Sequence, residues 1–244
     1  GTSVKGKSAT EVANMLKSDS VKTSTIVVKR NDKELTFKVT KENITLFSVS
    51  SEMLDNNGKN VGYLSVSIFG QKTYSQFKDA LTKLEKQDMD SLIIDLRGNT
   101  GGYLSTVTNM LEEFIDKGNV IYQIQSSSGV KQYKTVKASD KKYKIVVLID
   151  GGSASASEIM SAAMKEVYGA TLVGQTTYGK GTVQTTKDLS NGSMIKYTIE
   201  KWLTPSGKNI DKEGIKPDYE VDSYKNNPTK ENDAQLQKAL DLLK

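Results

Sequence analysis

Two short runs of small residues carry the side chains in this sequence that could do chemistry. The run 151–158 holds three serines, and the run 179–184 holds one lysine between two glycines. The 244 residues include no histidine and no cysteine, so the usual proton acceptor for a serine nucleophile is absent. A hydrolase built on these runs would need lysine as its base, and that lysine must be desolvated to become neutral.

The serine run has two interpretations. Ser155 and Glu158 match the Ser-x-x-Glu capping box that begins many helices, and the small residues around them would permit close packing. Alternatively, a serine hydroxyl at a helix N-terminus could act as a nucleophile, because free backbone N–H groups there can stabilise an oxyanion. A cap and a nucleophile need the same position, so this run alone leaves both open.

The lysine run lies at the end of a near match to a phosphate-binding loop. Residues 174–180 fit the pattern G-x-x-x-x-G-K after an expected strand at 170–173. Two features count against nucleotide binding: Gly181 stands where a Ser or Thr would hold magnesium, and the β-branched stretch 182–186 predicts a strand where a helix is required. A surface lysine in a glycine turn and a general base remain as interpretations of Lys180.

A third run, 95–102, follows an apolar stretch and opens a helix expected near Tyr103. Its adjacent glycines would let the backbone approach a ligand closely, so an amide here could face a developing oxyanion. The alternative is a glycine turn with a structural ion pair between Asp95 and Arg97. None of the three runs is decisive by itself.

The elements that must position these runs predict an α/β core. Apolar stretches at 92–96 and 145–149 are typical of strands buried on both faces. The runs that follow them would lie past the carboxyl ends of these strands, where open α/β sheets bind ligands. Helices are expected at 73–86 and 158–164, a strand at 193–199, and a short amphipathic helix at the C-terminus.

The beginning of the chain predicts a smaller unit. A helix with Val12 and Leu16 on one face precedes strands at 25–30 and 34–39, which flank a turn at 31–32. One helix and two strands are too small to fold alone. The sequence begins with neither an initiator Met nor a signal peptide, which predicts a processed or trimmed chain.

Composition excludes several classes of function. The net charge of +5 comes from scattered lysines and not from a basic block with interleaved aromatics, so we expect no nucleic-acid binding. No apolar run approaches the roughly 18 residues needed to span a bilayer. The absence of cysteine excludes disulfides and thiolate metal sites. We expect neither a cofactor nor a metal.

Taken together, the motifs resemble those of the carboxyl-terminal processing proteases, also called tail-specific proteases, a serine peptidase family. The matching blocks are 95–102, 152–159, 179–184, and 204–207 with 214–218. The similarity extends over about residues 61–221. It implies a crotonase-like α/β protease core with a partial PDZ-like segment at the N-terminus, which gives three parts: 1–46, similar to the second half of a PDZ domain, 47–222, the protease core, and 223–244, a C-terminal helical segment.

The resemblance also implies the roles of individual residues. Ser155 would be the nucleophile, Lys180 its general base, and Gln184 the residue that orients the lysine. The amides of Gly101 and Ala156 would form the oxyanion hole. We expect Tyr178, Val183 and the strand before Gly174 to supply apolar walls around Lys180.

The implied activity is that of a serine endopeptidase acting outside the cytoplasm on proteins or peptides with accessible C-termini, and it leaves a homodimer open. The loop and strand with which a PDZ domain captures a carboxylate would precede residue 1, so we expect little discrimination between substrate tails. Two alternatives remain: a catalytically inactive binding or scaffold protein on the same fold, and a nucleotide-binding protein that uses 174–180.

Overall fold

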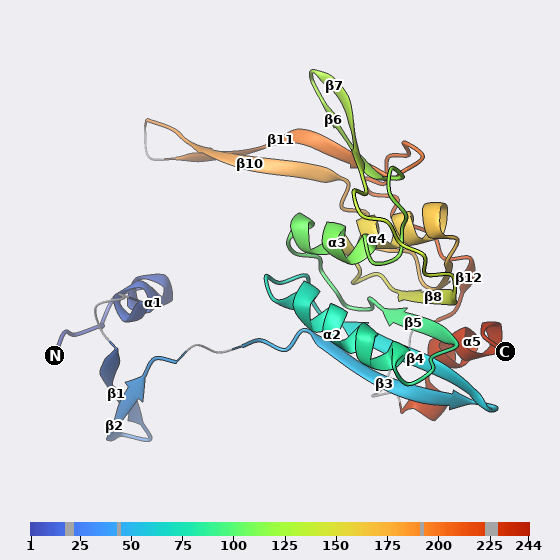
Figure 1. Cartoon of the computed structure of the whole chain (residues 1–244). Helices are drawn as coiled ribbons and strands as arrows, with labels where there is room; N and C mark the ends of the chain where they lie inside the picture. Colours follow the sequence, from blue (N-terminus) through green and yellow to red (C-terminus); the bar gives the residue numbers. More distant parts are fainter. Residues whose placement is uncertain (18–21, 43–44, 191–192, 223–228) are drawn as a thin grey trace. The chain divides into compact units, whose positions relative to one another are not determined.

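The computed structural model in Figure 1 describes residues 1–17, 22–42, 45–190, 193–222 and 229–244. The chain divides into two compact units, Gly1–Thr45 and Leu46–Lys244. Each unit is described by itself. No helix among the described residues is both long and apolar enough to cross a bilayer.

The first unit contains the predicted helix and hairpin. Helix α1 spans Ala9–Lys17, and strands β1 (Thr23–Arg30) and β2 (Lys33–Thr40) pair antiparallel around the predicted turn at 31–32. None of the described residues of this unit is fully buried, and Phe37 is 45% exposed. The described residues of this unit therefore form secondary structure without a hydrophobic core.

The second unit is built on a six-stranded sheet, which confirms the predicted α/β core. The strand order is β12-β9-β8-β5-β4-β3; the β3–β4 pair is antiparallel and the other neighbours are parallel. The stretches predicted as strands buried on both faces form β5 and β8. The strands are β3 (Val49–Asn56), β4 (Lys59–Val66), β5 (Ser91–Asp95), β8 (Lys144–Ile149), β9 (Thr171–Gly174) and β12 (Tyr219–Glu220).

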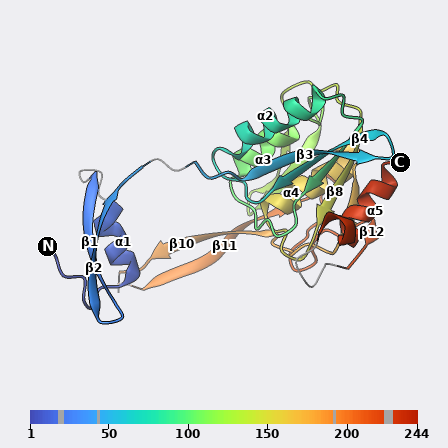
Figure 2. The ribbon, with the colours of Figure 1, turned by 90° about the horizontal axis from the view of Figure 1, so that it is seen from below.

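Helices cover both faces of this sheet (Figure 2). One face packs against α2 (Thr73–Glu85), α3 (Leu104–Leu111) and α4 (Ala156–Ala163), and α4 continues into a π-helical turn, η1 (Met164–Tyr168). The alternate side chains of the same strands face the other way and pack against α5 (Ala234–Leu242), which follows the 3-10 turn η2 (Lys230–Asn232). The described part of the predicted C-terminal segment, 229–244, thus belongs to the same compact unit as the sheet; residues 223–228 lie outside the described residues.

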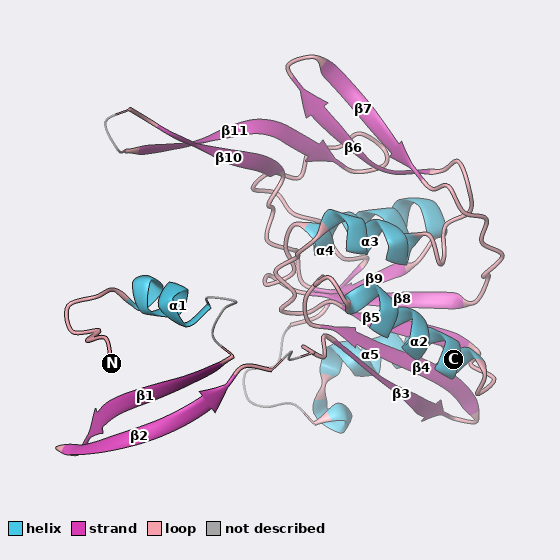
Figure 3. Ribbon diagram, turned by 60° about the vertical axis from the view of Figure 1, so that its left-hand side comes forward, coloured by secondary structure: helices cyan, strands magenta, loops and turns pink. Residues whose placement is uncertain are grey.

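A second, smaller sheet contains four antiparallel strands in the order β10-β11-β6-β7 (Figure 3). They are β6 (Val120–Ser126), β7 (Gly129–Lys134), β10 (Thr182–Asp188) and β11 (Met194–Leu203). Strand β10 begins two residues after Lys180. A strand therefore stands where a phosphate-binding loop would need a helix, which rules out the nucleotide-binding interpretation of 174–180.

Candidate active site

Ser155 lies in the sharp turn between β8 and α4, as the N-cap residue of the helix. Its backbone has φ 57° and ψ −114°, a conformation that a residue with a side chain adopts only when its surroundings impose it. Ser155 is half-buried, whereas Ser153 and Ser157 are fully buried. Their hydroxyls donate to the backbone oxygens of Leu96 and Asn99, at 2.8 and 2.7 Å. Ser155 is therefore the accessible serine of the run.

Asp150 ties this turn to the glycine loop that follows β5. Its Oδ1 accepts hydrogen bonds from the backbone N–H groups of Gly98 at 2.9 Å, Gly152 at 2.9 Å and Ser153 at 3.1 Å. One carboxylate thus fixes two loops that are more than 50 residues apart in the sequence. The two parallel strands β5 and β8 are neighbours, so their carboxyl ends place these loops side by side.

The fully buried Asn99 makes the second connection between the loops. Its Nδ2 donates to the Val66 oxygen at 2.7 Å, and its backbone oxygen accepts from the Ala154 N–H at 3.0 Å. Its Oδ1 accepts from the Gly101 N–H at 2.9 Å. The Gly101 amide, a predicted oxyanion donor, is therefore engaged within its own loop.

Gly101 nevertheless lies directly against the serine. It has φ 105°, and a Cβ placed on it would lie 2.9 Å from the Ser155 Cβ and 3.1 Å from the Ala156 nitrogen. Only glycine permits this approach. The Ala156 N–H, the first amide of α4, has no hydrogen-bond partner among the described residues and points from the positive end of the helix. Gly101 and Ala156, the predicted oxyanion residues, thus lie directly beside Ser155.

The backbone around Lys180 is as constrained as that around Ser155. Trp202, which is buried, donates its Nε1–H to the Lys180 oxygen at 2.6 Å. The Gly179 oxygen accepts from the Lys212 N–H at 2.8 Å. A Cβ on Gly181 would lie 2.6 Å from the Asp211 nitrogen, so the loop that carries Asp211 packs directly onto the lysine turn.

The side chain of Lys180 differs from the prediction. Lys180 is exposed, Tyr178 is 67% exposed, and Val183 is only half-buried, so the expected desolvation of Lys180 by these residues is wrong. The physical reason is that β10, the strand after Lys180, belongs to the smaller sheet and not to the six-stranded sheet of the core, so it does not bury the lysine side chain. Gln184, on β10, is exposed as well.

A pocket of about 620 Å³ is lined by Lys180 and Gln184. Ser155 and Gly101 do not line it, but their sequence neighbours Ala154 and Thr100 do. Within the described part of the chain, no hydrogen bond joins the side chains of Ser155, Lys180 and Gln184. Of the five predicted site residues, Lys180 and Gln184 thus line the pocket itself, and the side chains of Ser155, Lys180 and Gln184 are not paired with one another.

An ionic network connects the glycine loop after β5 to α5. The sequence predicted only one ion pair of this network. The predicted pair of Arg97 and Asp95 is present at 2.6 Å, and Arg97 also binds Asp233, the N-cap of α5, at 2.8 Å. Burial opposes the charge on Arg97, but the two carboxylates outweigh it and raise the pKa of the guanidinium. The Tyr63 hydroxyl donates to Asp95 at 2.6 Å, and burial together with that carboxylate raises the pKa of the phenol. No local sequence signal relates Asp233 to Arg97.

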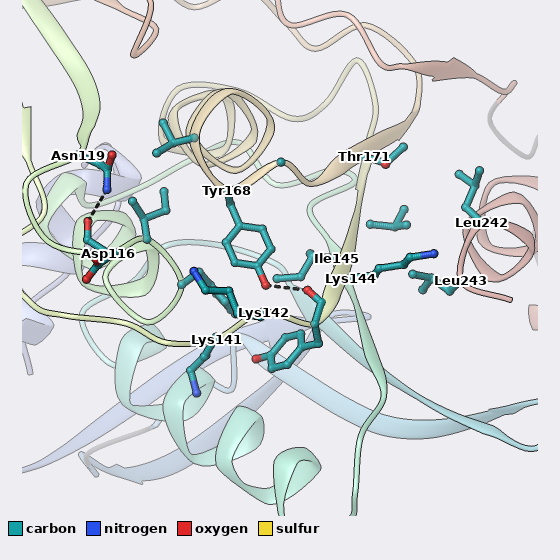
Figure 4. A pocket seen from close by; sticks show the side chains of 16 residues that line it. Asp116, Asn119, Lys141, Lys142, Lys144, Ile145, Tyr168, Thr171, Leu242 and Leu243 are labelled. Atoms are coloured by element: carbon teal, nitrogen blue, oxygen red, sulfur yellow. Dashed lines mark hydrogen bonds between the residues drawn. The ribbon is translucent and has the colours of Figure 1, made fainter.

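A second cavity, of about 470 Å³, lies at the opposite ends of the same strands, where β8 and β9 begin (Figure 4). Lys142 and Lys144 line it, and the Tyr168 hydroxyl donates to the Tyr143 oxygen at 2.6 Å. None of the predicted site residues lines this cavity. Among the residues described by the structure, acidic side chains nowhere gather in a group of three that could hold a metal ion.

Comparison with known families and proteins matches this chain to a peptidase family. The model of peptidase family S41 matches residues 60–221. The chain is 38% identical over 226 residues to a probable CtpA-like serine protease of Staphylococcus epidermidis, covering 91% of the chain and 45% of the relative. It is 42% identical over 186 residues to the carboxy-terminal processing protease CtpB of Bacillus subtilis, covering 76% and 39%. The chain thus spans less than half the length of these relatives.

Solved structures agree. The photosystem II D1 C-terminal processing protease superposes with a TM-score of 0.67 at 30% identity, over 91% of this chain and 61% of that one. A structure described as a putative peptidase from Parabacteroides merdae gives a TM-score of 0.68 at 18% identity, over 80% and 64%. At that identity the second likeness concerns the fold alone.

Proposed function

Because the chain belongs to peptidase family S41, we propose that it is a serine endopeptidase that cleaves proteins at or near their C-termini. The observation that carries the proposal is the state of Ser155. It is the accessible serine of its run, its backbone is strained, and Gly101 packs directly against it. Backbone strain at an accessible nucleophile is typical of sites that the fold preorganises for attack.

In the proposed reaction, Ser155 Oγ attacks the scissile carbonyl carbon while neutral Lys180 Nζ takes the hydroxyl proton. The tetrahedral oxyanion is stabilised by the Ala156 N–H and by the Gly101 N–H. The C–N bond then breaks, the lysine ammonium protonates the leaving amine, and an ester to Ser155 remains. Water attacks the ester with Lys180 again as base, and the released Oγ recovers a proton.

Three features of the site must change for this reaction. Lys180 has to lose its contact with water, and a peptide in the 620 Å³ pocket would exclude that water. Gln184 lines the same pocket and would accept a hydrogen bond from Nζ, which would orient it toward Ser155. The Gly101 N–H would have to be shared between Asn99 Oδ1 and the oxyanion.

The remaining parts of the proposal rest on family resemblance. We propose that residues 1–46 are the second half of a PDZ domain, that 47–222 form a crotonase-like core followed by the helical segment 223–244, and that the chain acts outside the cytoplasm. Its substrates would be proteins or peptides with accessible C-termini. A homodimer is compatible with this proposal.

A second candidate is a binding or scaffold protein on the same fold. It is favoured by one observation, the exposure of Lys180 and Gln184 without a hydrogen bond to Ser155. In that case the pocket would hold an extended peptide without cleaving it.

Cleavage of casein, an unstructured protein, separates the two candidates. The peptidase proposal predicts cleavage by the wild-type chain, none by Ser155→Ala, and wild-type cleavage by Ser75→Ala, which removes an exposed serine hydroxyl from α2 as a matched control. Binding of casein without cleavage by the wild-type chain would favour the scaffold. Equal cleavage by the wild-type chain and Ser155→Ala would contradict the proposed nucleophile.

A further inference from the structure

Glu158 is a buried carboxylate for which the proposed reaction has no use. It is the third residue of α4 and is completely inaccessible to solvent. Burying a carboxylate without a cation beside it costs much free energy unless hydrogen-bond donors surround the charge. No lysine or arginine side chain forms an ion pair with Glu158 within the described ranges, so its stabilisation must come from such donors.

Four donors converge on this carboxylate. Oε2 accepts from the Ser155 N–H at 2.8 Å and from the Lys180 N–H at 3.0 Å. Oε1 accepts from the Gly179 N–H and from the Thr177 hydroxyl, both at 2.7 Å. The Thr177 hydroxyl oxygen in turn accepts from the Ile215 N–H at 2.7 Å.

A helix cap accounts for only one of these bonds. The capping box explains why Glu158 binds the Ser155 N–H, and the positive end of α4 favours its charge. The other three donors belong to the lysine loop, about 20 residues further along the chain. The side chain therefore joins two loops, one carrying the proposed nucleophile and the other the proposed base.

This junction limits the separation of the two residues. The backbone nitrogens of Ser155 and Lys180 lie 2.8 and 3.0 Å from the same oxygen, so they can be no more than about 5.8 Å apart. A lysine side chain has a flexible stem of four carbons, long enough to cross such a gap. Rotation about side-chain bonds could thus bring Nζ to Oγ without movement of either backbone.

We propose that Glu158 is a positioning residue for the Ser155–Lys180 pair: its carboxylate holds both backbones at a fixed separation, so that formation of the pair requires only a rotation of the lysine side chain. The inference rests on the proposed peptidase function. It assigns Glu158 no contact with substrate and no proton transfer.

Glu158→Gln is the main test because it changes the acceptors and hardly the shape. Each carboxylate oxygen faces two donors, so a glutamine NH₂ group in either orientation would point at two donors and leave them without an acceptor. We expect kcat per folded molecule to fall by at least about tenfold with KM changed by less than about twofold, because the reacting groups are displaced while the substrate contacts remain. The backbone amide NMR signals of Ser155 and Lys180 should both shift.

Thr177 supplies a matched pair of milder variants. Thr177→Val removes the hydroxyl that donates to Glu158 and should lower kcat. Thr177→Ser keeps a hydroxyl at this position and should have the wild-type kcat. If Glu158→Gln does not fold, this pair carries the test. A role in stability alone predicts a lower melting temperature with wild-type kcat per folded molecule in Glu158→Gln or Thr177→Val, and that result would overturn the inference.

Failure of this inference is distinguishable from failure of the proposed function. If Ser155→Ala cleaves casein as well as the wild-type chain does, the peptidase mechanism is wrong. The amide signals of the Glu158→Gln chain would still show whether one carboxylate joins the two loops. If Ser155→Ala is inactive while Glu158→Gln keeps wild-type kcat and unshifted amide signals, the mechanism stands and the role of Glu158 is wrong.

Discussion

The two halves of the proposed site, around Ser155 and around Lys180, differ in how far the fold fixes their side chains. Around Ser155, polar groups such as the half-buried Asp150 and the fully buried Asn99 fix the backbone, and the Ser155 side chain stays half-buried. Around Lys180 the backbone is equally constrained, yet the side chains of Lys180 and Gln184 extend into an open pocket. The fold thus fixes the proposed nucleophile, whereas it fixes only the backbone of the proposed base.

This difference has a physical cause. A hydroxyl beside a helix N-terminus needs little besides a correct turn, because the nearby N–H groups are part of the backbone. A lysine base must lose its charge, and that requires the removal of water. Lys180 is exposed to water in this structure, and a peptide bound in the pocket would remove that water.

Ser155→Ala should have the largest effect on activity. Removal of the proposed nucleophile is expected to lower kcat/KM on a fluorogenic peptide by at least about 10⁴-fold, as in serine peptidases generally. The melting temperature should hardly change, because the half-buried hydroxyl carries no core packing. Turnover at the wild-type rate would mean that Ser155 is not the nucleophile, and the comparison between the Ser155 and Lys180 sides of the site would lose its basis.

Lys180→Arg should abolish activity without affecting stability. A guanidinium stays charged and cannot accept the serine proton, so a loss of about 10²–10⁴-fold is expected. Lys180 is exposed, so the melting temperature should stay unchanged. Lys212→Arg is the matched control, since Lys212 lines the same pocket, and it should keep wild-type turnover. An active Lys180→Arg chain would mean that another group is the base.

Asn99→Ala should lower the unfolding free energy, because Asn99 holds the glycine loop that packs against Ser155. The change deletes the bonds to the Val66 oxygen and the Gly101 N–H inside a fully buried site. We expect unfolding free energy to fall by about 2–3 kcal/mol, measured by urea denaturation. A change below about 0.5 kcal/mol, the size usual for surface positions, would show that the loop is not fixed by this side chain.

Gln184→Ala should lower activity but leave stability unchanged. Gln184 is exposed, so unfolding free energy should stay within about 0.5 kcal/mol of the wild-type value. If the side chain orients Lys180 in the substrate complex, kcat should fall by about tenfold. Wild-type kcat in this variant would mean that Gln184 does not orient Lys180 in the substrate complex.

The smallest expected effect concerns backbone strain at Ser155. Glycine adopts φ near 57° without strain, whereas alanine does not, so Ser155→Gly should be more stable than Ser155→Ala by about 1 kcal/mol. For a chain of this size that corresponds to about 2–4 °C in melting temperature. Calorimetry of the two variants gives the sign directly; the reverse order would mean that the turn relaxes when the serine is removed.

Local patterns predicted most of the fold and only part of the site. The strands β5 and β8 were predicted correctly because continuous apolar runs report burial on both faces, and the β1–β2 hairpin because 31–32 is a good turn. Which serine is accessible could not be read locally, because Ser153 and Ser157 are buried by contacts with backbone oxygens more than 50 residues away.

The site residues that sequence reasoning missed share this long-range character. Glu158 is recognisable as a cap, but its bonds to Gly179 and Lys180 depend on the meeting of two loops. The exposure of Lys180 was mispredicted because β10, the strand that follows it, pairs with β11, whose partner residues lie as far away as Lys201.

A crystal structure of the chain with a peptide boronic acid bound to Ser155 would show whether Lys180 reaches the serine from a fixed backbone. We predict that Lys180 Nζ lies about 2.6–3.2 Å from Ser155 Oγ, with Gln184 in contact with Nζ. We also predict that the backbone N–H groups of Ser155 and Lys180 still donate to Glu158. A lysine that remains in solvent, or a lysine loop that has separated from Glu158 to reach the serine, would contradict a base completed by side-chain rotation on a fixed backbone.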